Sequence, residues 1–176
     1  MDLSSWSLGL VLIVLTIAIH TTAVVFMAFG LERRIRVRVH TRKPDLRRAI
    51  PAVIGHIGAV ALALAALHGM EGVLWAVAYR WLGALDSFTT ASVFALATMT
   101  TFEIPGLTLP PRFQMISALQ AVNGVLLFGI STAFLFAVIQ VYWQLLSRRH
   151  TEQRSPDLYG PLASTRRAEP DEEQAR

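Results

Sequence analysis

The sequence predicts an all-helical integral membrane protein, with three membrane-spanning helices and one re-entrant helix and loop in each subunit. Three observations support this fold class. The chain has 176 residues, of which 53% are hydrophobic and 16% charged, and its mean hydropathy is +0.48. Its apolar residues form long runs flanked by basic stretches, the pattern typical of membrane helices with cytoplasmic loops. Between residues 97 and 111, a short threonine-rich stretch with a single carboxylate separates two of these runs.

The first apolar segment extends from about residue 6 to residue 30 and contains no charged side chain. It exceeds the roughly 20 residues that a helix needs to cross the hydrocarbon core. No basic stretch precedes it, and its apolar run is longer than the roughly 7–15 residues of a signal-peptide core. We therefore expect a retained membrane helix.

A strongly basic stretch, residues 31–48, follows this helix. Positive charge beside apolar segments marks the cytoplasmic side of a membrane, so we expect a cytoplasmic loop here. Such a loop also attracts anionic lipid headgroups. The predicted headgroup contacts are Arg33, Arg34, Arg36, Arg38, Arg42 and Lys43. Basic residues beside the membrane segments explain the net charge of +4, which therefore does not indicate a nucleic-acid partner.

The second apolar segment begins at residue 49, and its helical pattern continues through Trp75 and Tyr79 toward residue 82. The third, residues 86–100, is too short to span a membrane. Asp86 or Ser87 is expected to cap its N-terminus. Its many small and hydroxylated residues suit close packing inside a bundle.

The polar stretch after this short helix contains Glu103, and Pro105 and Gly106 are expected to turn the chain. In lipid, irregular backbone is tolerated only where it is buried in protein or lines a watery cavity. An ionisable residue at such a place is a functional-site hypothesis. Half-helix and loop together therefore predict a re-entrant pore element.

The fourth segment, residues 113–146, is long enough to cross the membrane and project into the cytosol. Gly124 and Gly129 are candidates for a gating hinge or for close helix packing. Asn123 is expected either to face a cavity or to form a hydrogen bond with the short helix. Residues 147–176 are polar and proline-containing, and we expect a disordered cytoplasmic tail.

Residues 49–146 resemble the pore domain of small bacterial potassium-channel-like proteins, a family of two-helix, tetrameric cation channels. Three stretches carry the resemblance: M-E-G-V-L-W-A-V-A-Y-R-W-L-G-A-L at 70–85, V-F-A-L-A-T-M-T-T-F-E-I-P-G-L-T-L-P-P-R-F-Q at 93–114, and A-V-N-G-V-L-L-F-G-I-S-T-A-F-L-F-A-V-I-Q at 121–140. The resemblance implies an outer helix, a pore helix (86–100), a selectivity filter (100–106) and an inner helix (113–146), assembled as a homotetramer. Residues 1–48 are then a peripheral helix and its basic loop.

The filter departs from the family pattern T-V-G-Y-G-D. The six corresponding positions in this chain are Thr101, Phe102, Glu103, Ile104, Pro105 and Gly106, and Thr100 precedes them in the predicted filter. Aligned without gaps, Glu103 and Pro105 replace the two filter glycines. Glycine reaches left-handed dihedrals at little cost, whereas proline is fixed near −65° in φ. We therefore do not expect the usual filter of stacked carbonyl rings; at most, Thr101 and Thr100 keep a deep ion site.

Four copies of Glu103 around a fourfold axis would form a carboxylate ring, a device of cation-selective filters. The stretch T-T-F-E also resembles the T-L-E core of bacterial sodium-channel filters. The function expected from the resemblance is a cation channel in which this ring attracts Na⁺, K⁺ or Ca²⁺. Two alternatives stay open: a non-conducting pseudo-channel that acts as a scaffold or binds lipid or a partner, and a K⁺-permeable channel with an unusual filter. Glu103 could instead cap backbone amides in a closed loop.

Two pairings that involve histidine are weaker hypotheses: the first pair named below could hold haem or a metal, and the second could bind a metal at the outer mouth. His20 and His56 lie at similar distances from the cytoplasmic ends of their helices, and His68 and Glu71 share one helix face. Hydrogen bonding between helices is the simpler role for each, so no cofactor and no resident metal are expected. Neither a nucleophile triad nor a phosphate-binding loop is present, so an enzyme is not expected.

The charge pattern also predicts the orientation in the membrane. We expect a multi-pass protein of the inner (plasma) membrane with its N-terminus outside and its C-terminus in the cytoplasm. A four-span arrangement would place the basic tail outside, against the charge bias.

Overall fold

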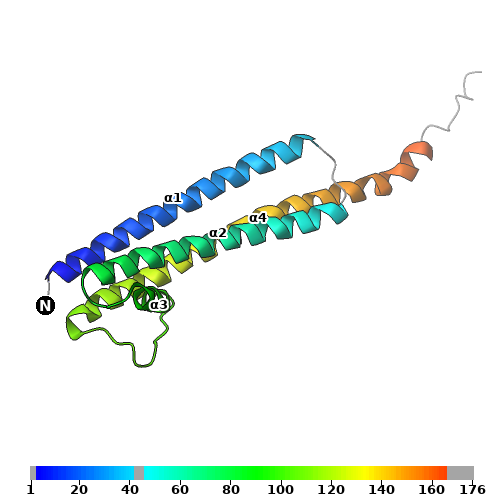
Figure 1. Ribbon diagram of the computed structural model, residues 1–176. Coiled ribbons are helices and arrows are strands. Elements are labelled where there is room, and N and C mark those ends of the chain that lie inside the picture. The colour runs from blue at the N-terminus through cyan, green and yellow to red at the C-terminus, as the bar shows by residue number, and fades with distance from the viewer. Residues whose placement is uncertain (1–2, 42–45, 166–176) are drawn as a thin grey trace, which may run out of the picture. The chain divides into compact units, whose positions relative to one another are not determined.

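The computed structural model describes residues 3–41 and 46–165, including the side chains of residues 6–34, 50–144 and 147. Within these ranges the fold is all-helical, without strands (Figure 1). The elements are α1 (Leu3–Thr41), α2 (Leu46–Trp81), α3 (Phe88–Met99), the 3-10 turn η1 (Pro111–Phe113) and α4 (Gln114–Thr165). The predicted all-helical class is therefore confirmed.

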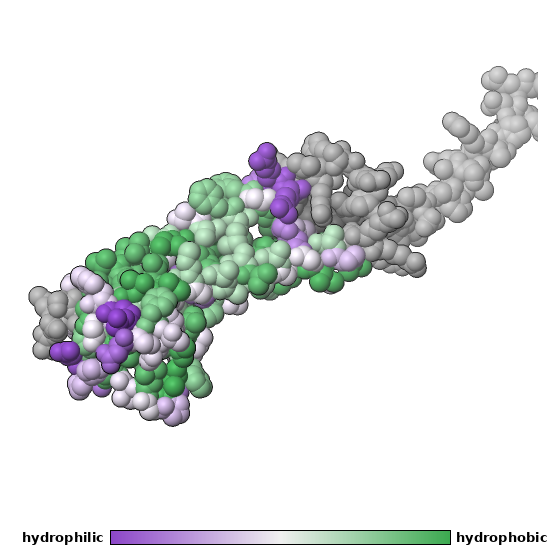
Figure 2. Space-filling view, in the orientation of Figure 1, coloured by the Kyte–Doolittle hydropathy of each residue, from purple (hydrophilic) through white to green (hydrophobic). Residues whose placement is uncertain are grey.

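Three of the helices are long and apolar enough to cross a membrane. Their apolar stretches are Trp6–Arg34, Ile50–Trp81 and Pro111–Gln144, whereas α3 has only 12 residues. The shortest stretch, of 29 residues, covers about 43 Å at 1.5 Å per residue, more than the roughly 30 Å of hydrocarbon core. Many of their large apolar side chains are exposed, and hydrophobic residues dominate much of the face in Figure 2. These features are consistent with a multi-pass membrane protein.

The basic stretch 31–48 is more helical than the sequence indicated. Helix α1 continues to Thr41 and α2 begins at Leu46, so most of the expected loop belongs to one helix or the other. Leucine, glutamate and arginine favour helices, and neither glycine nor proline occurs between Leu31 and Thr41. A helix that has formed in the apolar stretch therefore meets no residue that would end it there.

The expected disordered tail also differs from the structure. Helix α4 continues to Thr165, so residues 147–165 are helical, and residues 166–176 lie outside the described residues. The expectation of disorder considers only how little apolar surface this segment can bury. However, the costly step in forming a helix is the first turn, and each later residue except proline (here Pro156 and Pro161) adds a backbone hydrogen bond. An existing helix can therefore extend into a polar segment.

The short helix α3 forms as predicted and is held on two sides. Ser87 caps its N-terminus, because its Oγ accepts a hydrogen bond from the Thr90 amide at 3.0 Å. Tyr79 of α2 meets Phe94 edge to face, with ring centroids 5.3 Å apart. On the other side, the Gln120 amide nitrogen of α4 donates to the Ala95 carbonyl at 3.0 Å. These contacts fix α3 between the second and third long helices.

Small residues let the backbones approach closely around α3. Ala91 and Ala95 are fully buried on its inner face. A Cβ atom added to Gly124 of α4 would lie 2.2 Å from the Met99 carbonyl oxygen. Real Cβ atoms do not come so close to an oxygen, so this position requires glycine. The predicted packing role of Gly124 is thus supported by a specific contact, with the last residue of α3.

Substitution of Gly124 by alanine should destabilise the fold. The added methyl group would force the end of α3 away from α4, and overpacking of this kind costs about 1–3 kcal/mol. The matched control is Gly129→Ala on the same helix, where nothing lies within 4 Å of the added Cβ. Thermal unfolding of both variants in one detergent gives the comparison. Equal stability of the two variants would contradict the close contact.

Candidate functional site

The predicted re-entrant element is α3 together with the loop of residues 101–110. The loop begins after the C-cap Thr100 and ends at Pro110, the N-cap of η1. The end of α2 and the start of α4, which this element connects, lie at the same end of the helical bundle (Figure 1). The chain therefore enters and leaves the element on one side.

The loop reverses direction immediately after α3. The Phe102 amide donates to the Ala97 carbonyl at 2.9 Å, and the Thr101 amide donates to the Thr98 carbonyl at 3.0 Å. This pair of bonds is the Schellman motif, which requires a residue of positive φ after the C-cap. Thr101 occupies that position with φ of +58°, although β-branched residues are strained there. The loop's own amides thus close the last turn of α3.

A second turn follows at residues 104–107. The Leu107 amide donates to the Ile104 carbonyl at 3.1 Å, and Gly106 has φ of +80°. Proline at the second position and glycine of positive φ at the third are typical of a type II turn. Pro105 and Gly106 therefore turn the chain, as the sequence indicated.

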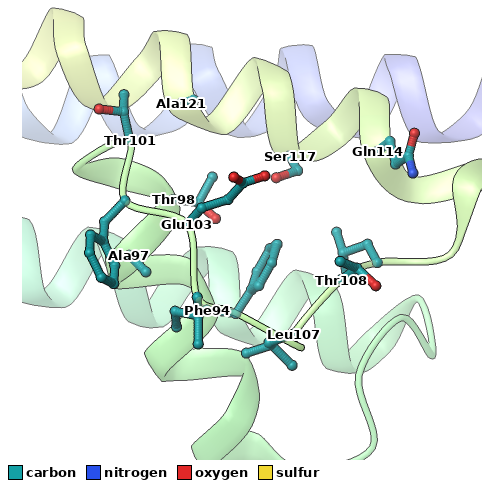
Figure 3. Close-up of a pocket in the computed structure, with 13 residues that line it drawn as sticks. Phe94, Ala97, Thr98, Thr101, Glu103, Leu107, Thr108, Gln114, Ser117 and Ala121 are labelled. Carbon is teal, nitrogen blue, oxygen red and sulfur yellow. The ribbon is translucent and has the colours of Figure 1, made fainter.

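Glu103 lies between these two turns and lines a pocket of about 540 Å³. Figure 3 shows its carboxylate directed into the pocket, on the side of Ser117 from α4. The residue is exposed, and among the described residues its carboxylate forms neither a hydrogen bond nor an ion pair. In particular, it does not cap the amides of its own loop.

The pocket brings together oxygen-bearing side chains from three segments. Thr98 comes from α3, Thr101, Glu103 and Thr108 come from the loop, and Gln114 and Ser117 come from α4. A carboxylate surrounded by hydroxyl and amide oxygens suits hard cations such as Na⁺, Mg²⁺ or Ca²⁺. The C-terminal end of α3, with its partial negative charge, adds to the attraction for a cation.

Two other residues of the predicted filter line this pocket, and Thr100 does not. Phe102 and Ile104 line it with apolar surface, and Phe102 is 65% exposed. The Thr100 hydroxyl donates to the Ala97 carbonyl at 2.9 Å. Thr100 therefore contributes to the end of α3 in this structure rather than to the pocket.

Asn123 has a partner that the sequence did not indicate. It is fully buried and donates from Nδ2 to the Thr16 hydroxyl of α1 at 2.9 Å. Both expectations for it, a cavity-facing side chain and a bond to the short helix, are therefore wrong. Gln120, three residues earlier, forms the bond to α3 instead. The helical pattern places both residues near the same face and does not distinguish their partners.

Three polar side chains from two helices form a buried cluster that the sequence did not indicate as a group. It consists of His20 from α1 and His68 and Glu71 from α2. The i, i+3 spacing indicated the second pair, but nothing in the sequence indicated that His20 joins it. His20 bonds Glu71 through Nδ1 and Ser131 through Nε2, so neither ring nitrogen is directed to His56. His56 lies about 18 Å along α2 from His68.

The predicted headgroup contacts are described only in part. Arg33 and Arg34 are exposed near the end of the apolar stretch of α1. Arg36 and Arg38 belong to α1, but their side chains are outside the described set, and Arg42 and Lys43 lie outside the described residues.

No protein-family model, curated protein or solved structure matches this chain. The likeness of residues 49–146 to potassium-channel-like proteins therefore stands on the residues that carry it.

Proposed function

We propose that this chain is the subunit of a homotetrameric cation channel in the inner (plasma) membrane, with a Glu103 ring in place of a potassium-type filter. The observation that carries the proposal is the helix–loop element between two membrane-length helices. Its half-helix α3 is capped by Ser87, and its loop presents a carboxylate with no partner among the described residues. An unpaired carboxylate beside membrane-spanning segments is costly unless an ion or water accompanies it.

Tetrameric assembly is part of this proposal, because one chain supplies only one side of a pore. Apolar side chains on α3 and on the first half of α4 are exposed in the single chain. They include Phe88, Val93, Leu96, Val122, Val125 and Leu126. Neighbouring subunits and lipid would both cover such surfaces.

A specific observation favours the non-conducting alternative as the second candidate. The Schellman closure after α3 turns the Ala97 and Thr98 carbonyls toward amides of the loop. Glu103 also lies in a pocket shared with α4 of the same chain. A loop that stays closed in this way would occlude the path, and current measurements separate the two candidates.

Assembly is the first test. In mild detergent or lipid nanodiscs, native mass measurement should give about 78 kDa of protein, for four chains of 19.4 kDa each. A monodisperse, folded monomer or dimer in both environments would contradict the pore proposal.

Orientation is tested with single cysteines, since the chain has none of its own. Membrane-impermeant labelling from the outside should modify Asp86→Cys and leave Arg38→Cys unmodified. Asp86 is exposed just before α3, and Gly83 is avoided because its φ is +65°. Labelling of both sites after permeabilisation is the control. The reverse pattern would invert the topology.

The role of Glu103 is tested by Glu103→Gln, which keeps the shape and removes the charge. Under identical bi-ionic gradients, cation selectivity over anions and divalent block should both weaken in the variant, because charge attracts cations at the constriction. The matched control is Asp86→Asn, which removes one exposed charge before α3 and should leave both quantities unchanged.

Robust current with both quantities unchanged in Glu103→Gln would show that Glu103 is not the selectivity element. No current from folded tetramers of either protein would favour the non-conducting candidate. A reversal potential that follows the K⁺ gradient alone would favour the K⁺-selective alternative.

A further inference from the structure

The buried cluster of His20, His68 and Glu71 lies within the apolar stretches of α1 and α2. His20 is 14 residues from either end of Trp6–Arg34, which places it about 21 Å along the helix from each end. His20 and Glu71 are fully buried, and His68 is 7% exposed. Ionisable side chains at such depth are expensive and carry a functional hypothesis.

The cluster is joined by two hydrogen bonds. His20 Nδ1 and Glu71 Oε1 lie 2.9 Å apart, and His20 Nε2 and the Ser131 hydroxyl lie 3.0 Å apart. The rings of His20 and His68 meet edge to face with centroids 5.1 Å apart, and Phe128 stacks on His68 at 4.2 Å. Side chains from α1, α2 and α4 therefore enclose one small polar centre.

Two ligand atoms in this centre have no hydrogen-bond partner among the described residues. They are His68 Nε2 and Glu71 Oε2, and both are buried. His68 Nδ1 lies 2.8 Å from the Leu64 carbonyl oxygen. Because that oxygen only accepts, Nδ1 carries the proton and Nε2 presents a lone pair. A bound cation would coordinate both the nitrogen lone pair and the carboxylate oxygen, neither of which accepts a hydrogen bond from the described residues.

We propose that His20, His68 and Glu71 form a transition-metal site, with Zn²⁺ as the preferred ion. One ligand atom from each residue lies within 4.8 Å of the other two. Zinc bonds of about 2.0–2.1 Å in tetrahedral geometry place ligand atoms about 3.3–3.5 Å apart. The longest distance between ligand atoms therefore needs to shorten by about 1 Å or a little more when the ion binds. The proposal is independent of the channel proposal.

The chemistry of the donors decides the class of ion. Imidazole nitrogens suit zinc, copper, iron and nickel, whereas Mg²⁺ and Ca²⁺ prefer oxygen ligands. Two histidines and one carboxylate leave a fourth position for water. Zinc has no geometric preference from its d electrons, so its tetrahedral site tolerates ligands that come from two helices.

His20 can become a metal ligand through the nitrogen that now bonds Glu71. Its Nδ1 faces Glu71, so this nitrogen is the ligand, and metal binding selects the neutral tautomer whose single ring proton is on Nε2. Nε2 then carries the proton and donates it to the Ser131 oxygen, because a hydroxyl both donates and accepts. Ser131 thereby orients the metal-bound ring, as a carboxylate or carbonyl does in other histidine sites.

Zinc binding to the full-length protein in nanodiscs, with any affinity tag removed, tests the proposal. Metal analysis after equilibration with ZnCl₂ and chelator competition should give one saturable Zn²⁺ per chain. His68→Ala and Glu71→Gln should weaken binding by at least about 100-fold, more than the 10–100-fold expected for Ser131→Ala. His56→Ala is the control and should bind as the wild type does.

The absorption spectrum of the protein loaded with Co²⁺ is a second readout. Nitrogen–oxygen tetrahedral bands should be present in the wild type and His56→Ala, and absent in His68→Ala. No saturable zinc in the folded wild type would overturn the proposal and leave a hydrogen-bonded cluster only. Zinc that binds equally to the wild type, His68→Ala and Glu71→Gln would also overturn it. Because no arm measures current, these outcomes are distinct from failure of the channel proposal.

Discussion

Hydrogen bonds between buried polar side chains are the interactions on which the helical arrangement depends. Inside a bilayer the hydrophobic effect does not drive helices together, since lipid is as apolar as leucine. Here α1 is joined to α4 by Asn123 and Thr16, and to α2 by His20 and Glu71. Tyr79 donates to Gln120 at 2.7 Å, and Gln120 in turn donates to α3. Each of these bonds links two helices. Together they fix which face each helix turns toward its neighbour, as well as which helices are in contact.

The same bonds explain why α3 and the loop that follows it have a defined place. Helix α3 buries Ala91 and Ala95 in the core, and its neighbours add a hydrogen bond, an aromatic contact and a glycine that allows close approach. The strained Thr101 is held at the end of a helix that is fixed in this way. Strained backbone persists where the surrounding structure determines it, and it is frequent at functional sites.

The sequence predicted the elements well because their signals are local. Apolar run length identified the three long helices. Asp86 or Ser87 was the predicted cap of α3, and the structure has Ser87; Pro105 and Gly106 indicated the turn. Helix ends in polar segments were less predictable, since α1 and α4 continue where no apolar pattern remains. Propagation of an existing helix depends on the preceding turns and not on the composition of the segment alone.

Partners between helices were not predictable from one sequence. The choice between Gln120 and Asn123 as the residue that contacts α3 depends on a rotation of less than one helical turn. His20 was matched with His56 on depth alone, whereas the structure joins it to Glu71. Periodicity identifies the face of a helix, but it does not identify which residue of another helix meets that face.

The sequence separation of these bonds has a consequence for biosynthesis. His20 meets Glu71 51 residues later in the chain and Ser131 111 residues later. At translation rates of about 5–20 residues per second, the second separation corresponds to roughly 6–22 s. During that interval α1 carries a histidine whose final partners have not yet been made. In that interval water or another polar group must satisfy His20, because an unpaired polar side chain in the hydrocarbon core is costly.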